Sequence, residues 1–118
     1  MTRLFTLFCL FSVLVMTTTA CTTVRMGKDF DPRSFEQWVA RGETTQNEVK
    51  QRLGAPTSTG GVVESDGRYY VRWNYYYGQG KIYKLGDADF KLLEIRFNSE
   101  KKVVSYNWSA PEPKQETP

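Results

Sequence analysis

Cys21 is the residue of this chain whose type and setting point most directly to chemistry. It follows a basic residue at Arg3, an apolar run over 4–16 and the small residues of 17–20. An apolar run of about thirteen residues is shorter than the roughly twenty that a transmembrane helix needs, so the segment is typical of a cleaved export signal. We expect cleavage between Ala20 and Cys21, which makes Cys21 the first residue of the mature chain.

A cysteine in this position resembles the lipobox of bacterial lipoproteins. The resemblance implies a diacylglycerol joined by a thioether to the Cys21 sulfur, and an acyl chain such as palmitate on its amine. Each buried methylene contributes about 0.8 kcal/mol, so three chains together would anchor the protein in a membrane. The pair Thr18 and Ala20 also satisfies the small-x-small rule of ordinary secretion. In that alternative Cys21 would be a free thiol.

Other chemistry has little support in the sequence. The chain has no histidine, and Cys9 lies within the export signal, so the mature chain keeps a single cysteine. The usual zinc, copper and haem ligands are therefore missing. Ser65 and Ser105 lack a histidine that could activate a hydroxyl, and Asp87 and Asp89 lack further oxygen ligands at calcium-loop spacing. We expect neither an enzyme nor a bound metal or other cofactor.

The charge of the chain does not indicate a nucleic-acid partner. The net charge is +3 over the whole chain, and removal of Arg3 with the export signal lowers it further. Basic and acidic residues are interspersed, and no basic run is longer than Lys101-Lys102. Nucleic-acid binding needs a concentrated basic surface, so we do not expect it.

Composition divides the chain into four parts. The export signal covers 1–20, and the short polar stretch 21–30 is expected to be a lipidated N-terminus and tether. One domain covers 31–108, a size at which the hydrophobic core is marginal. The proline-containing stretch 109–118 is expected to be a disordered tail.

Two short helices are predicted at the start of the domain. Asp31-Pro32 supplies an N-cap followed by a proline suited to the first helical position, and an apolar face runs from Phe35 to Val39. Gly42 can end this helix. Thr45 to Glu48 has the spacing of a capping box for a second helix, which Gly54 can end. Such short helices need a surface on which to pack.

Three strands are predicted after the helices. They cover Arg68 to Tyr77, Phe90 to Phe97 and Val103 to Trp108, where apolar and polar residues alternate. The turn Asp66-Gly67 precedes the first strand, whose start could pair briefly with Val62-Val63. A connection through Gly78, Gly80 and Gly86 precedes the second strand. The expected fold is α+β, with two short helices packed on a three-stranded antiparallel sheet in the order α-α-β-β-β.

Alternation in the first predicted strand separates two faces. The core face would hold Tyr69, Val71, Trp73, Tyr75 and Tyr77. An arginine between aromatic residues on the other face can bind a partner protein, a glycan or a lipid headgroup, although tyrosine in a strand is also simply favourable packing. The candidate partner surface is therefore made of Tyr70, Arg72, Asn74 and Tyr76.

An ordered set of short motifs resembles the small outer-membrane lipoproteins of the SmpA/OmlA, or BamE-like, family. The resemblance covers about Phe35 to Ser109. It rests on Gly42-Glu43-Thr44-Thr45, Glu48-Val49, Leu53-Gly54-Ala55-Pro56, Asp66-Gly67, the aromatic strand around Trp73 to Tyr77, and Phe97-Asn98 with Val103-Val104. Three features depart from the family pattern. The Thr44-Thr45 pair, which broader relatives have, stands where the barrel-assembly member has a shorter turn. Gly78 stands where that member has arginine, and Lys101 where relatives often have glycine.

The resemblance implies a noncatalytic domain on the periplasmic face of the outer membrane, anchored there through acylated Cys21. Members of the family contact envelope proteins, including the machinery that inserts β-barrel proteins, and some contact anionic lipid headgroups. Thr22 is not the aspartate that commonly retains lipoproteins at the inner membrane. The departures favour a relative with a partner of its own.

A second hypothesis belongs to a different class of protein. A helix-on-sheet unit also resembles the repeats of a secreted β-lactamase inhibitor. The alternative function is therefore a tethered or secreted inhibitor, or a module that binds a small ligand.

Overall fold

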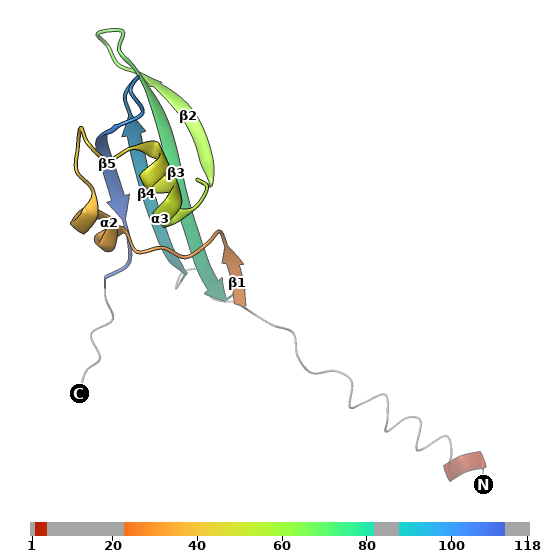
Figure 1. Ribbon diagram of the computed structural model, residues 1–118. Coiled ribbons are helices and arrows are strands. Elements are labelled where there is room, and N and C mark those ends of the chain that lie inside the picture. Colours follow the sequence, from red (N-terminus) through yellow and green to blue (C-terminus); the bar gives the residue numbers. More distant parts are fainter. Residues whose placement is uncertain (1, 5–22, 82–87, 113–118) are drawn as a thin grey trace.

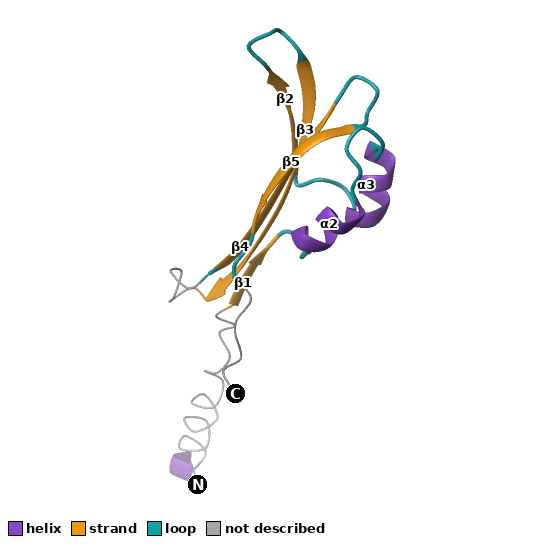
Figure 2. Ribbon diagram, turned by 90° about the vertical axis from the view of Figure 1, so that its left-hand side faces the viewer, coloured by secondary structure: helices purple, strands orange, loops and turns teal. Residues whose placement is uncertain are grey.

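A computed structural model describes residues 2–4, 23–81 and 88–112 (Figure 1). In this part of the chain one antiparallel sheet of five strands carries two short helices on one of its faces (Figure 2). The α+β class is as predicted, whereas the predicted number of three strands is too low. The expected cleavage site at Ala20 and the expected lipid-attachment residue Cys21 lie outside the described residues, as do Gly86 and Asp87.

Helix α2 covers Pro32–Trp38 and begins as predicted. The Asp31 carboxylate accepts a hydrogen bond of 3.0 Å from the backbone N–H of Arg33. The helix ends before Gly42, because Val39 already has an extended backbone. Gly42 lies in the following loop with a φ of 81°, so its predicted role as the residue that ends the helix was wrong.

Helix α3 covers Gln46–Leu53 and has both of its predicted ends. The hydroxyl of Thr45 accepts a hydrogen bond of 3.2 Å from the N–H of Glu48. Gly54 ends the helix with a φ of 79°, a region that favours glycine. No helix within the described residues has the length and apolar character needed to cross a membrane.

The five strands are β1 (Thr23–Met26), β2 (Ser58–Val63), β3 (Tyr69–Lys81), β4 (Asp89–Phe97) and β5 (Val103–Ser109). Strand β3 is the longest, and β4 pairs along one of its edges. At about 3.4 Å per residue its thirteen residues span about 44 Å, which is long enough for two short strands placed end to end. Strands β2 and β1 share its other edge, opposite residues 69–74 and 78–81 respectively.

Strand β1 lies in the segment that was expected to be a tether. Its residues pair with the end of β3, from Thr23 opposite Lys81 to Met26 opposite Gly78. Gly78 and Gly80 therefore belong to a strand, not to the predicted connection. Glycine suits these positions because neighbouring side chains lie over them: an added Cβ at Gly78 would be 3.1 Å from the Phe90 ring.

The predicted turn at Asp66-Gly67 is present, and a second tight turn joins β4 to β5. Gly67, with a φ of 84°, lies in the β2–β3 turn, where the Asp66 carboxylate accepts from the N–H of Arg68 at 3.0 Å. In the β4–β5 turn the side-chain oxygen of Asn98 accepts two backbone hydrogen bonds. Lys101 adopts a φ of 60° in that turn, which is strained for a residue with a side chain.

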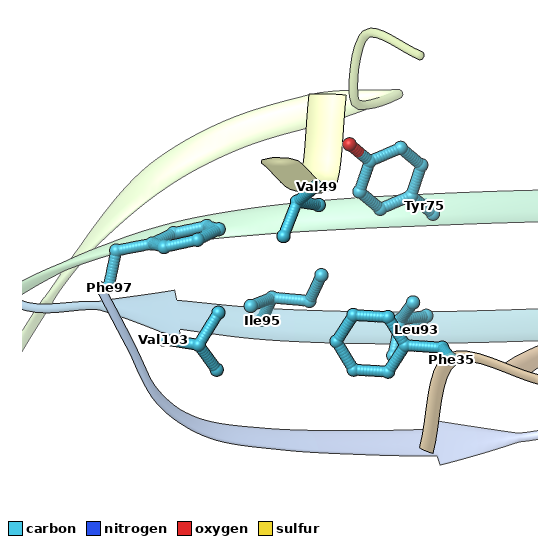
Figure 3. Packing of buried hydrophobic residues seen from close by; sticks show 7 residues of the cluster. All are labelled: Phe35, Val49, Tyr75, Leu93, Ile95, Phe97 and Val103. Atoms are coloured by element: carbon cyan, nitrogen blue, oxygen red, sulfur yellow. The ribbon is translucent and has the colours of Figure 1, made fainter. Parts of the chain in front are cut away.

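The core lies between the helices and the sheet (Figure 3). The side chains of Phe35 from α2 and Val49 from α3 are fully buried against the strands. The hydroxyl of buried Tyr75 donates a hydrogen bond of 2.8 Å to the carbonyl of Gly54, which ties β3 to the end of α3. The other members of the core are Leu93, Ile95, Phe97 and Val103.

Two boundary predictions differ from the structure. Tyr69 was expected in the core, but it is 60% exposed, because the β2–β3 hairpin extends beyond the two helices (Figure 2). Ser109 was expected to open a disordered tail, but it belongs to β5. The Arg33 guanidinium also donates to the carbonyl of Pro111 at 3.2 Å. Residues 113–118 lie outside the described part of the chain.

Candidate functional site

The candidate partner surface lies on the face of the sheet that α2 and α3 do not cover, which we call the outer face (Figure 2). Side chains alternate between the two faces of a strand, and Tyr75 and Tyr77 of β3 are buried on the helix side. The intervening residues of β3 therefore point to the outer face. As predicted, they include Tyr70, Arg72, Asn74 and Tyr76.

Arg72 is at the centre of the polar part of this face. It pairs with Gly60 of β2 on one side and Arg96 of β4 on the other. A Cβ added at Gly60 would be 2.9 Å from a terminal nitrogen of Arg72, so the guanidinium lies across the glycine. The buried Nε of Arg72 has no hydrogen-bond partner among the described residues. The group keeps an unused donor, which is uncommon for a buried polar atom.

The carboxylates near Arg72 interact with the neighbouring arginine instead. Arg96 donates to Glu64 at 2.9 Å and to Glu94 at 3.3 Å. Both pairs are partly exposed, so solvent weakens them and they contribute little to stability. Arg72 and Arg96 thus lie opposite one another, and of these two arginines Arg96 alone has an acidic partner among the described residues. Arg72 is half-buried and has no acidic partner among the described residues.

The other members of the candidate surface have different surroundings. The side-chain amide of Asn74 donates to the Ser58 hydroxyl at 3.1 Å. Asp66 raises the pKa of the Arg68 guanidinium through a hydrogen bond and its negative charge, and the half-buried Tyr70 raises this pKa further. The Tyr76 ring instead packs against Phe90, with 6.2 Å between the ring centroids. The structure therefore separates Tyr76 from the polar group.

Tyr76 belongs to a second group on the outer face, which we call the apolar platform. Met26 and Phe90 pair with Gly78 from opposite sides, and Leu92 pairs with Tyr76. These side chains are exposed: 53% for Met26, 50% for Phe90 and 36% for Leu92. The full group is Val24, Met26, Tyr76, Phe90 and Leu92. It lies at the end of the sheet where β1 begins.

Sequence reasoning did not identify the platform, although the alternation of residues contained a signal. Phe90 and Leu92 alternate with the core residue Leu93 in the same way as Glu94 does, so the three side chains lie on one face of the strand. Val24 and Met26 also alternate with polar residues, as strand residues do. Their convergence depends on the pairing of β1 with β3, which no local pattern indicated.

A groove lies at the opposite end of the domain, between the start of β3 and the β4–β5 turn. It encloses about 770 Å³. Tyr69, Val71 and Phe97 give it an apolar wall, and Arg68 and the strained Lys101 add basic groups. A groove of this size can hold a small ligand or a side chain of a partner protein.

The described residues contain no group of three histidine, cysteine or acidic side chains that could hold a metal ion. What the outer face offers is a guanidinium with an unused donor and, further along the same face, an exposed apolar surface. Such a surface can bind, with the charge giving specificity and the apolar side chains giving affinity.

Comparison of the chain with protein-family models, with curated proteins and with solved structures finds no match. The resemblance to the BamE-like lipoproteins therefore stays a prediction from the motifs.

Proposed function

We propose that this chain is a noncatalytic, lipid-anchored envelope protein that binds a protein partner through the polar part of its outer face. Acylated Cys21 anchors it to the periplasmic face of the outer membrane. Its role is that of an accessory or scaffold protein, related to the accessory lipoproteins of barrel assembly but with a partner of its own.

The observation that carries this proposal is the unpartnered Arg72. Its Nε is buried without a hydrogen bond, and no acidic side chain of the described residues pairs with its guanidinium, so the positive charge is open to compensation by a charged group of a partner. A carboxylate is the natural partner, because the planar guanidinium can donate two parallel hydrogen bonds to it. Tyrosine and arginine are also enriched among the residues that dominate binding energies.

The partner surface can be tested by photo-crosslinking in intact cells. A photoreactive amino acid replaces Asn74 on the outer face, and a matched control replaces Lys50, which is exposed on α3. We expect a discrete cross-linked envelope protein from position 74 and none from position 50. Equal products from both positions would contradict the assignment of the outer face.

A substitution then tests the role of the guanidinium. Arg72→Met should reduce the cross-link from position 74 about tenfold or more, as expected for the loss of a binding residue worth about 1.4 kcal/mol or more. Arg41→Met removes an exposed arginine from the loop between the helices and is the control. Because Arg72 makes no hydrogen bond or ion pair among the described residues, its replacement should leave thermal stability nearly unchanged. A cross-link that persists in Arg72→Met would contradict the proposal.

The anchor needs a separate measurement. Mass spectrometry of the mature N-terminus should find Cys21 with its sulfur and amine acylated. A free thiol at Cys21 would refute the anchor while leaving the partner surface open to the cross-linking test.

The groove favours a second candidate function, that of an inhibitor or a small-ligand-binding module. Its apolar wall and its volume of about 770 Å³ suit a side chain of a target enzyme or a small ligand. Stoichiometric inhibition of an envelope enzyme by the purified chain would favour this function. That inhibition should then be weakened by Tyr69→Ala, which alters the groove, and not by Arg72→Met.

A further inference from the structure

We propose that the apolar platform lies on the surface of the lipid bilayer, beside the acyl anchor. The platform thus fixes the orientation of the domain on the membrane. This inference rests on the proposed acylation of Cys21.

The platform is continuous across three strands. Gly78 lies between Met26 of β1 and Phe90 of β4, and Val24 lies opposite Gly80. Gly78 has no side chain of its own, and the Phe90 ring lies over it, where an added Cβ would be 3.1 Å away. Contiguous exposed apolar side chains on a small domain mark a contact surface.

The position of the platform in the chain identifies what it contacts. Three residue steps separate Cys21 from Val24, and an extended chain covers at most about 11 Å in three steps. Acyl chains on Cys21 would therefore enter the bilayer next to Val24. The stretch that could have been a longer leash is held in β1, whose four residues pair with β3. As long as β1 stays paired, the platform cannot move far from the membrane.

The polar part of the outer face lies away from this end. Arg72 is four residues before Tyr76, the member of the platform nearest to it along β3, which corresponds to about 14 Å in an extended strand. Because both groups share one face of the sheet, Arg72 remains accessible to a protein partner when the sheet stands at an angle to the bilayer with its β1 end lowest. One sheet face would thus serve both contacts.

Fluorescence of a label on the platform tests the inference in the acylated full-length mature protein. The mature chain contains no cysteine besides Cys21, so a cysteine introduced by Met26→Cys is the one free thiol available for an environment-sensitive label. The control is Asn107→Cys, which places the label at an exposed position of β5. Asn107 pairs with Glu94 and shares the outer face with the platform. The label at position 26 replaces a side chain that is already about half exposed, so the fold should tolerate it.

The protein is reconstituted into phosphatidylcholine vesicles, whose lack of net charge isolates the apolar contact. We expect label emission at position 26 to shift to shorter wavelength and to be quenched several-fold more by a lipid-attached quencher than emission at position 107. Equal and water-like emission at both positions, with the protein still bound to vesicles, would overturn the inference and leave the anchor intact.

Two further outcomes overturn the inference in different ways. Failure of the protein to bind vesicles, together with a free Cys21 thiol, would remove the anchor and this inference with it. A wavelength shift at position 26 that grows with protein concentration in the absence of vesicles would show that a second copy of the chain covers the platform.

Discussion

Gly27 controls whether β1 can pair with the sheet, and its replacement gives a sharp test of the fold. It follows β1 directly and has a φ of 77°. A Cβ added there would overlap the carbonyl oxygen of Tyr76. Gly67 offers a matched control, because its φ of 84° is similar while an added Cβ would meet no atom within 4 Å.

The two alanine variants share one unfavourable contribution and differ in the other. The left-handed backbone destabilises alanine by about 1–2 kcal/mol, and part of this is offset by the lower entropy of the unfolded chain. Gly67→Ala should therefore lower the free energy of unfolding by about 1 kcal/mol. Gly27→Ala must also separate the chain from Tyr76, which means that β1 moves away from β3.

Gly27→Ala can lower the free energy of unfolding by no more than the detachment of β1 would, because the chain can relieve the clash by releasing this strand. All four residues of β1 are exposed, so its detachment uncovers no part of the core. It removes a few backbone hydrogen bonds, each with a net contribution of about 0.5–1.5 kcal/mol. The expected decrease in the free energy of unfolding is thus about 2–3 kcal/mol, with most of the structural change confined to β1 and the end of β3.

The assay combines urea unfolding with amide hydrogen exchange, both in a Cys21→Ser background that excludes acylation. In Gly27→Ala the amides of residues 23–26 and 78–81 should lose protection, while those of β4 and β5 keep it. In Gly67→Ala all of these amides should stay protected. If Gly27→Ala destabilises no more than Gly67→Ala and keeps the protection of β1, the reasoning from the Tyr76 contact is wrong.

Three further predictions concern local interactions. Burial raises the pKa of Tyr75 to about 12 from 10.0. Between these pH values the native state keeps a proton that the unfolded chain loses, so the free energy of unfolding should fall by up to about 1.4 kcal/mol per pH unit. The fall should be smaller in Tyr75→Phe, which lacks the titrating hydroxyl. Lys101→Gly should raise the melting temperature, since it relieves the φ of 60° and contributes up to about 1 kcal/mol. Thr45→Ala removes the hydroxyl that caps α3 and should lower the free energy of unfolding by about 1 kcal/mol in urea titrations, whereas Thr45→Ser should restore most of it.

The elements that the sequence predicted correctly are those with local signals. Asp31 and Thr45 cap the helices through bonds to residues two and three positions further on, so nearby sequence is sufficient to locate them. Strand β1 has no such signal. Its four residues become a strand because β3 offers an edge opposite 78–81, and the glycines of that edge suggested a loop when read locally.

The candidate surface was predictable in part for the same reason. Alternation alone places Arg72 and Tyr76 on one face. The unpaired state of Arg72 was not predictable, because it depends on Glu64 and Glu94 both approaching Arg96. These side chains come from two different strands and a turn, and only the register of the sheet brings them together.

The pairing of Thr23 with Lys81 has a consequence for the order of events in biogenesis. A strand cannot dock before its partner has been delivered, so under the proposed export, with the N-terminus first, Lys81 would arrive long after Thr23. During that interval the residues around Cys21 have no folded neighbour on the sheet. Under the proposed acylation, processing at Cys21 would therefore come before the docking of β1 and would act on an unpaired chain.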